Sequence, residues 1–222
     1  IGNRAFMQCT GLTGIVLPDS ITGIGDSAFA NCTSLAQLTL SKRVTQIEKD
    51  AFLNCISLTQ VEIPKSLLSA SGIFAGCSGL KTITFEEGTE MIREGLLMNC
   101  GGLEEIIIPD TVMAIGNYAF SGCTNLSKID IPDSVVTIGE YAMSSCSGLS
   151  AIEIPGSVTT IGSYAFYGCS ALVSAEMADG VTTLGEYVFS GCTALPSFVM
   201  PDSVTTLGIR VFDGCSKLSS VT

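Results

Sequence analysis

Cysteine recurs along the chain at a nearly constant interval, and this spacing limits what the chain can fold into. The ten cysteines are Cys9, Cys32, Cys55, Cys77, Cys100, Cys123, Cys146, Cys169, Cys192 and Cys215. Successive cysteines lie 23 residues apart, except in the interval that ends at Cys77, which has 22 residues. One cysteine per unit at a fixed phase indicates a tandem array, and a period in the twenties is typical of a solenoid.

Other positions repeat in step with the cysteines. Leucine stands three residues after every cysteine, from Leu12 to Leu218. The unit that ends at Cys169 shows the remaining columns, which are Ile152, Ile154, Pro155, Val158, Ile161-Gly162 and Ala165-Phe166. Because apolar residues recur at fixed phases, stacked repeats can share one continuous core that a single repeat could not bury.

Each unit predicts three local structures. The segment 150–154 alternates apolar and polar residues, which favours a short strand with one buried face, and Pro155 ends it by removing a backbone donor. The Val-Thr-Thr-Ile segment that follows favours a second extended stretch. The segment 162–169 has the spacing of one helical or 3₁₀ turn.

The repeat unit resembles a known family. The pattern L-x-x-I-x-I-P-x-S-V-T-x-I-G-x-x-A-F-x-x-C resembles the BspA-like subclass of leucine-rich repeats over essentially the whole chain, most closely in 108–123, 131–146 and 154–169. The resemblance implies a curved, right-handed leucine-rich-repeat solenoid. Short parallel strands would line its concave face, with short extended or 3₁₀ or helical segments on the convex side. We expect residues 1–222 to form one domain of about ten repeats, cut within a repeat at both ends.

The composition excludes several functions. A net charge of −11 with no histidine disfavours nucleic acid and anionic membranes as partners. No apolar run is long enough to insert into a bilayer. Without histidine, Ser-His-Asp and Cys-His catalysis is impossible, and no nucleotide-binding motif occurs. One cysteine per rung cannot converge on a metal, so we expect no catalytic residues, no metal and no cofactor, and a column of buried free thiols.

The outward side of the first strand is one candidate ligand site. Stacking should bring acidic residues together there beside an apolar residue, namely Glu105, Ile107, Asp130, Glu153 and Glu176. Like charges at rung spacing repel, which a basic partner could relieve. The alternative is a solvated face that keeps an apolar protein soluble.

A tyrosine five residues before cysteine in successive repeats is the second candidate: Tyr118, Tyr141, Tyr164 and Tyr187. Stacked rings on the outer wall would offer contact surface to a glycan or peptide. The alternative is simple contact between neighbouring turns. A break in the pattern from Pro64 onward, with Arg93 in an unusual position, marks either a bend or contact region or neutral drift.

The function predicted is therefore macromolecular binding. The resemblance implies an adhesion-type domain of a cell-surface or secreted protein. The candidate surfaces favour a protein or glycan ligand, and the acidic residues favour a basic one. Two alternatives stay open. The domain could be a structural spacer without a ligand of its own, or an intracellular interaction scaffold, where reduced thiols would be stable.

Overall fold

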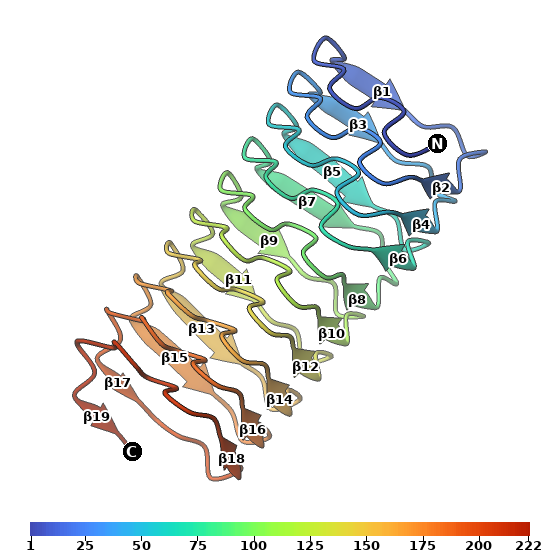
Figure 1. The fold of residues 1–222 in the computed structure, drawn as a ribbon. Helices are drawn as coiled ribbons and strands as arrows, with labels where there is room; N and C mark the ends of the chain where they lie inside the picture. Colours follow the sequence, from blue (N-terminus) through green and yellow to red (C-terminus); the bar gives the residue numbers. More distant parts are fainter.

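Short parallel strands in two rows run along the whole chain (Figure 1). The computed structural model describes all 222 residues and contains 19 strands and no helix. The first strand of each turn belongs to a row that we call the strand face, made of β1 (Gly14–Val16), β3 (Gln37–Thr39), β5 (Gln60–Ile63), β7 (Thr82–Phe85), β9 (Glu105–Ile107), β11 (Lys128–Asp130), β13 (Ala151–Ile154), β15 (Ser174–Met177), β17 (Ser197–Phe198) and β19 (Ser220–Val221).

A second row of two-residue strands forms the other side of the coil. We call it the outer row, and it consists of β2 (Gly23–Ile24), β4 (Gln46–Ile47), β6 (Ser69–Ala70), β8 (Met91–Ile92), β10 (Ala114–Ile115), β12 (Thr137–Ile138), β14 (Thr160–Ile161), β16 (Thr183–Leu184) and β18 (Thr206–Leu207). The even-numbered strands from β8 to β18 form one six-stranded sheet, and β2, β4 and β6 form a separate three-stranded sheet. The sheet of the outer row is therefore interrupted between β6 and β8.

The register between turns follows the sequence period. On the strand face Ile106 lies opposite Ile129, and in the outer row Ile115 lies opposite Ile138. Each residue thus faces its equivalent one repeat later, which confirms the solenoid. The strand face divides into five two-stranded ladders, such as β5 with β7 and β13 with β15.

The core is a continuous apolar column between the two rows. Phenylalanines fill its middle and stack on one another from turn to turn, with ring centroids 5.0 Å apart for Phe29 and Phe52 and 5.3 Å apart for Phe166 and Phe189. Leu97 and Met143 take the phenylalanine position in two of the turns. Six phenylalanines are fully buried, namely Phe29, Phe52, Phe74, Phe120, Phe166 and Phe189. The inward columns read from the sequence therefore form the core.

The predicted helical turn is absent, and a series of tight turns replaces it. In the segment 162–169 the amide of Ala165 donates to the carbonyl of Gly162 at 3.3 Å, but the amide of Phe166 donates to Val188 in the next repeat at 2.9 Å. Tyr164 and Gly168 have positive φ angles of 61° and 70°. Left-handed residues reverse the chain, so a helix cannot continue through them.

The cysteines form an inward column of free thiols. The thiol of Cys169 donates to the carbonyl of Met143 at 3.2 Å, and equivalent bonds recur along the stack. Eight cysteines are buried, but Cys9 is exposed and Cys215 is half-buried, contrary to the expectation that all ten would be buried. These two lie in the terminal repeats, where the stack covers them from one side only.

Arg93 lies in the turn that follows the short repeat. Most repeats have glycine in this column, with Glu48 as a second exception, and a Cβ on Gly116 would lie 2.8 Å from the backbone nitrogen of Glu94 in the preceding repeat. The repeat before Arg93 lacks one residue between Ala70 and Gly72, directly beneath that position. The Nη2 of Arg93 donates to the carbonyl of Leu67 in that shortened repeat, at 3.1 Å.

Candidate functional site

The strand face carries the first candidate site because strand residues alternate in direction. In β9, Ile106 is buried while Glu105 and Ile107 are exposed, and Ile107 is 81% exposed. Strand β11 likewise exposes Lys128 and Asp130. All five predicted residues, Glu105, Ile107, Asp130, Glu153 and Glu176, are exposed on this face.

The register divides these residues between two columns. Glu153 lies opposite Glu176, and Asp130 lies opposite Ile107. Glu105 belongs to the other column, where it lies opposite Lys128. The structure therefore places Ile107, Asp130, Glu153 and Glu176 in one line, with Glu105 beside it.

A lysine that the acidic interpretation left out lies within this group. Lys128 Nζ donates to Asp130 Oδ2 at 2.8 Å, and both side chains are largely exposed. The hydrogen bond to Asp130, with the charges of Asp130, Glu153 and Glu105, raises the pKa of Lys128. Lys128 lies 23 residues after Glu105, so the repeat itself places it in the same column one turn later. The line is thus neutralised at Asp130, and its unpaired negative charge lies at Glu153 and Glu176.

Hollows in the strand face lie beside these two glutamates. One of about 380 Å³ is lined by both Glu153 and Glu176 with Pro155 and Met177. A smaller one of about 150 Å³ lies between β11 and β13 and is lined by Lys128 and Glu153 among others. Strands β11 and β13 belong to different ladders, so this hollow follows a boundary between ladders.

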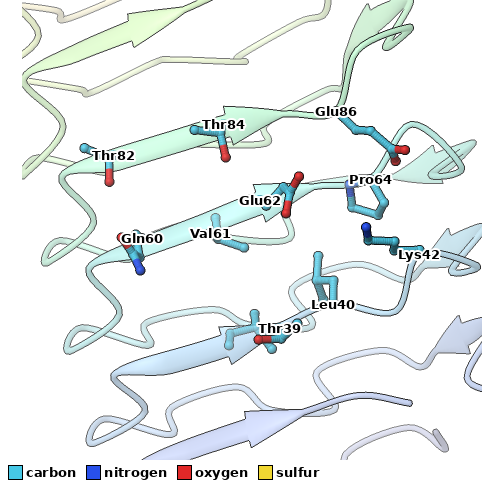
Figure 2. A pocket seen from close by; sticks show the side chains of 11 residues that line it. Thr39, Leu40, Lys42, Gln60, Val61, Glu62, Pro64, Thr82, Thr84 and Glu86 are labelled. Atoms are coloured by element: carbon cyan, nitrogen blue, oxygen red, sulfur yellow. The ribbon is translucent and has the colours of Figure 1, made fainter. Parts of the chain in front are cut away.

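A further hollow, which the sequence did not indicate, lies near the N-terminal end of the same face (Figure 2). It encloses about 340 Å³ across β3, β5 and β7. Figure 2 shows Glu62 and Gln60 on β5, with Lys42 and Glu86 on the loops at one end. Glu86 already pairs with Lys65 at 3.7 Å and accepts a bond from its amide at 3.1 Å. Glu86 stands where most repeats have proline, and this replacement was the sequence signal for the hollow.

The tyrosines form a ladder on the wall between the outer row and the cysteine column. The ring centroids of Tyr118 and Tyr141 are 4.7 Å apart, those of Tyr141 and Tyr164 are 4.6 Å apart, and those of Tyr164 and Tyr187 are 4.8 Å apart. The planes differ by no more than 7°. Both faces of the two central rings are therefore covered by neighbouring rings, so only their edges and hydroxyls can meet a ligand.

The tyrosine backbone is strained. All four tyrosines have positive φ angles between 55° and 61°. A left-handed backbone conformation destabilises a residue that has a side chain by roughly 1–2 kcal/mol. Each stacked aromatic pair stabilises the fold by about 0.5–1.5 kcal/mol, which offsets much of this strain. Partial desolvation and the adjacent phenol and carboxylate groups raise the pKa of Tyr141 and Tyr164. The phenols therefore stay neutral, as hydrogen-bonding groups.

No helix could cross a bilayer. No three Cys, Asp or Glu side chains are grouped so that they could hold a metal ion.

Comparison with known proteins places the chain among repeat proteins. A family profile described as BspA type leucine rich repeat region (6 copies) matches residues 1–127 and 90–219. No curated protein matches the sequence.

Solved bacterial structures are similar over the full chain. A leucine-rich repeat protein from Bacteroides ovatus shows 26% identity with a TM-score of 0.61, over 100% of this chain and 75% of that one. A leucine rich cell surface protein from Faecalibacterium prausnitzii shows 30% identity with a TM-score of 0.56, over 100% and 76%. A leucine-rich repeat protein from Eubacterium ventriosum shows 29% identity with a TM-score of 0.64, over 100% and 69%.

Proposed function

The chain belongs to the BspA-type leucine-rich-repeat family, and from this premise we propose that it is a non-catalytic, adhesion-type binding domain of a cell-surface or secreted protein. One observation carries the proposal: the strand face presents outward side chains on a regular backbone, and no other part of the chain covers them. Such a face is a ready-made surface for a macromolecule, as in other solenoids.

Charge indicates the kind of ligand. Glu153 and Glu176 lie in register and have no cationic partner, and they line a hollow together. Adjacent like charges repel, so a ligand with basic groups would relieve this cost. The exposed Ile107 offers an apolar contact at one end of the line. We propose a protein or glycan ligand that presents basic groups to Glu153 and Glu176.

Charge reversal tests this proposal. The change is Asp130, Glu153 and Glu176 to lysine together, measured as binding of the isolated domain to cells or matrix extracts at low salt, where electrostatic contacts are strongest. We expect a normally folded protein with weakened binding, because exposed substitutions usually change stability by no more than about 0.5 kcal/mol.

A matched control separates the strand face from net charge. Changing Glu48, Glu87 and Glu90 to lysine alters the net charge equally at exposed positions away from the strand face. We expect this control to bind as the wild type does. If both triples weaken binding equally, the effect belongs to overall charge and the strand-face assignment is wrong. If Tyr141→Ser and Tyr164→Ser abolish binding while charge reversal does not, the tyrosine ladder is the binding surface.

The spacer function is the alternative, and the uninterrupted stack of turns favours it. It would be supported if neither set of changes affected binding. Location has its own test: antibody against the folded domain should label intact producing cells as strongly as permeabilised ones. The description of the Faecalibacterium relative as a cell surface protein supports that expectation. Labelling only after permeabilisation would support the intracellular scaffold.

A further inference from the structure

Two adjoining hollows lie at the N-terminal end of the strand face, and we call them together the N-terminal trough. The first is the hollow of about 340 Å³ across β3, β5 and β7 (Figure 2). The second encloses about 490 Å³ across β1, β3 and β5. Leu38, Thr39 and Gln60 line both, so the trough is continuous from β1 to β7. Its outward residues include Gln37, Thr39, Gln60, Glu62, Thr82 and Thr84.

The trough follows a boundary between ladders. Strand β3 pairs with β1 and strand β5 pairs with β7, but β3 and β5 belong to different sheets. At this boundary Leu38 on β3 and Val61 on β5 line the hollow, although both are otherwise buried. Gly14 lines the β1 end without a side chain. The floor of the trough is therefore apolar, and its walls are the outward side chains.

The outward side chains of the trough carry unused hydrogen-bonding groups. The side chains of Gln37, Thr39 and Gln60 are exposed and make no hydrogen bond within the chain. Threonines beside the outer row differ, since Thr182 Oγ1 donates to the carbonyl of Thr159 at 3.1 Å. An amide has two donors and an acceptor, and a hydroxyl both donates and accepts. The trough thus presents both kinds of group above an apolar floor.

Charge in the trough is balanced. Lys42 and Glu62 line the first hollow, and neither takes part in an ion pair. Glu86, at the end of the same hollow, is already paired with Lys65 at 3.7 Å. The second hollow has no charged residue. Lys42 would repel a basic ligand, and the net charge of −11 would repel a polyanion, so the trough favours a neutral ligand.

A neutral sugar has the chemistry that these groups require. Each sugar ring carries several hydroxyls that both donate and accept, and its C–H face is apolar. That face can lie on Leu38 and Val61 while the hydroxyls reach the amide of Gln60 and the carboxylate of Glu62. An uncharged peptide has only one donor and one acceptor per residue on its main chain, so it would leave more of these groups unsatisfied. Both hollows lie within the range of about 300–1,000 Å³ that is usual for small-molecule sites.

We propose that the N-terminal trough binds two adjacent residues of a neutral glycan, one in each hollow. The glycan bonds to Gln37, Thr39 and Gln60 where the hollows meet. This site goes beyond the basic ligand proposed for Glu153 and Glu176. Strands β5 and β13 are four turns apart, which is roughly 19 Å at about 4.8 Å per turn. The glycan site therefore does not depend on the acidic one.

Glutamine side-chain NMR tests the trough, because the chain has only four glutamines. Gln37 and Gln60 lie in the trough, whereas Gln8 precedes Cys9 and Gln46 lies in β4 of the outer row. Protein with isotope-labelled glutamine is titrated with maltose, cellobiose, lactose and N,N′-diacetylchitobiose. We expect saturable shifts of the two trough amides with at least one disaccharide, and no shift of the other two. The matching monosaccharide should bind more weakly, because it occupies one hollow only.

A matched pair of threonine variants tests the contacts. Thr39→Val removes a hydroxyl that both hollows share and keeps the shape of the side chain, so it should weaken binding about 2- to 12-fold, the range for one hydrogen bond. Thr137→Val makes the same change at an exposed position of β12 and should leave binding unchanged. Shifts should be equal at low and high salt, because the ligand is neutral.

Several outcomes would overturn the glycan site. They are no shift of Gln37 and Gln60 with any of the disaccharides, equal shifts of all the glutamines, or equal effects of the two threonine variants. Shifts as strong with digalacturonate would indicate an acidic glycan, and shifts as strong with acetyl-Ser-Gly-Ser-amide would indicate a peptide site; either rejects the neutral glycan. The lysine triple at Asp130, Glu153 and Glu176 should keep the shifts, so failure of the basic-ligand proposal and failure of the trough are distinguishable.

Discussion

Removing one phenylalanine from the middle of the stack should cost a large share of the stability. Phe166 is fully buried and its ring stacks on Phe189 with centroids 5.3 Å apart. A buried phenylalanine removes roughly 150–250 Å² from water, which corresponds to about 4–6 kcal/mol at about 25 cal/mol per Å². Alanine retains part of that area, and extended-chain areas are upper bounds. We therefore expect Phe166→Ala to lower the free energy of unfolding by about 3–5 kcal/mol.

The matched control is the same substitution at the end of the column. Phe6 is 38% exposed and stacks on Phe29 at 4.9 Å, with no turn on its other side. Because the cost follows the area buried, Phe6→Ala should cost roughly half as much or less. Both variants are measured by urea unfolding with circular dichroism, with the slope compared to check that the same surface is exposed. A cost below about 1 kcal/mol at Phe166, or an equal cost at Phe6, would refute the inward phenylalanine column.

Two further predictions concern the thiols. In the native protein a thiol reagent should modify Cys9 quickly and Cys215 more slowly. In urea without reductant the reagent should modify all ten cysteines. Modification of fewer than ten in urea would reveal disulfides. Burial raises the pKa of Cys100, Cys146 and Cys192 from 9.0 to about 12, so the folded state holds these protons more tightly than the unfolded state. Stability from these groups is thus fully present below about pH 9 and is lost as pH rises toward 12, by about 1.4 kcal/mol per pH unit for each thiol. Urea unfolding at about pH 8, 9.5 and 10.5 should show this decline. Cys146→Ala should make the decline less steep, and an unchanged slope would contradict the assignment.

The sequence was sufficient to predict the solenoid, because the 23-residue period and the apolar core columns both indicate the same register between turns. A 23-residue interval places Ile106 opposite Ile129 whatever the turn between them does. The turns themselves were harder to predict. Ala165 and Phe166 have helical spacing, but the backbone angles of Tyr164 and Gly168 decide the conformation there, and tyrosine gives no signal for a left-handed residue.

The candidate sites were only partly predictable. The acidic positions on the strand face followed from alternation, whereas the ion pair of Lys128 with Asp130 depends on side-chain conformations that alternation does not determine. The hollow near Glu62 depends on how the ladders separate between β3 and β5, and the sequence marks it only by Glu86 in the place of the usual proline.

The uniform hydrogen bonding between turns has a consequence for how such a chain can change in length. Every turn offers its neighbour the same donors and acceptors at the same phase, as the amides of Tyr164, Phe166 and Gly168 do for the following repeat. A duplicated segment of one full period would therefore fit between existing turns without new contacts having to arise. Its inward columns would be held constant by the shared core, while its outward positions would be free to diverge. Genes for such arrays can thus gain or lose whole units and acquire new surfaces on an inherited frame.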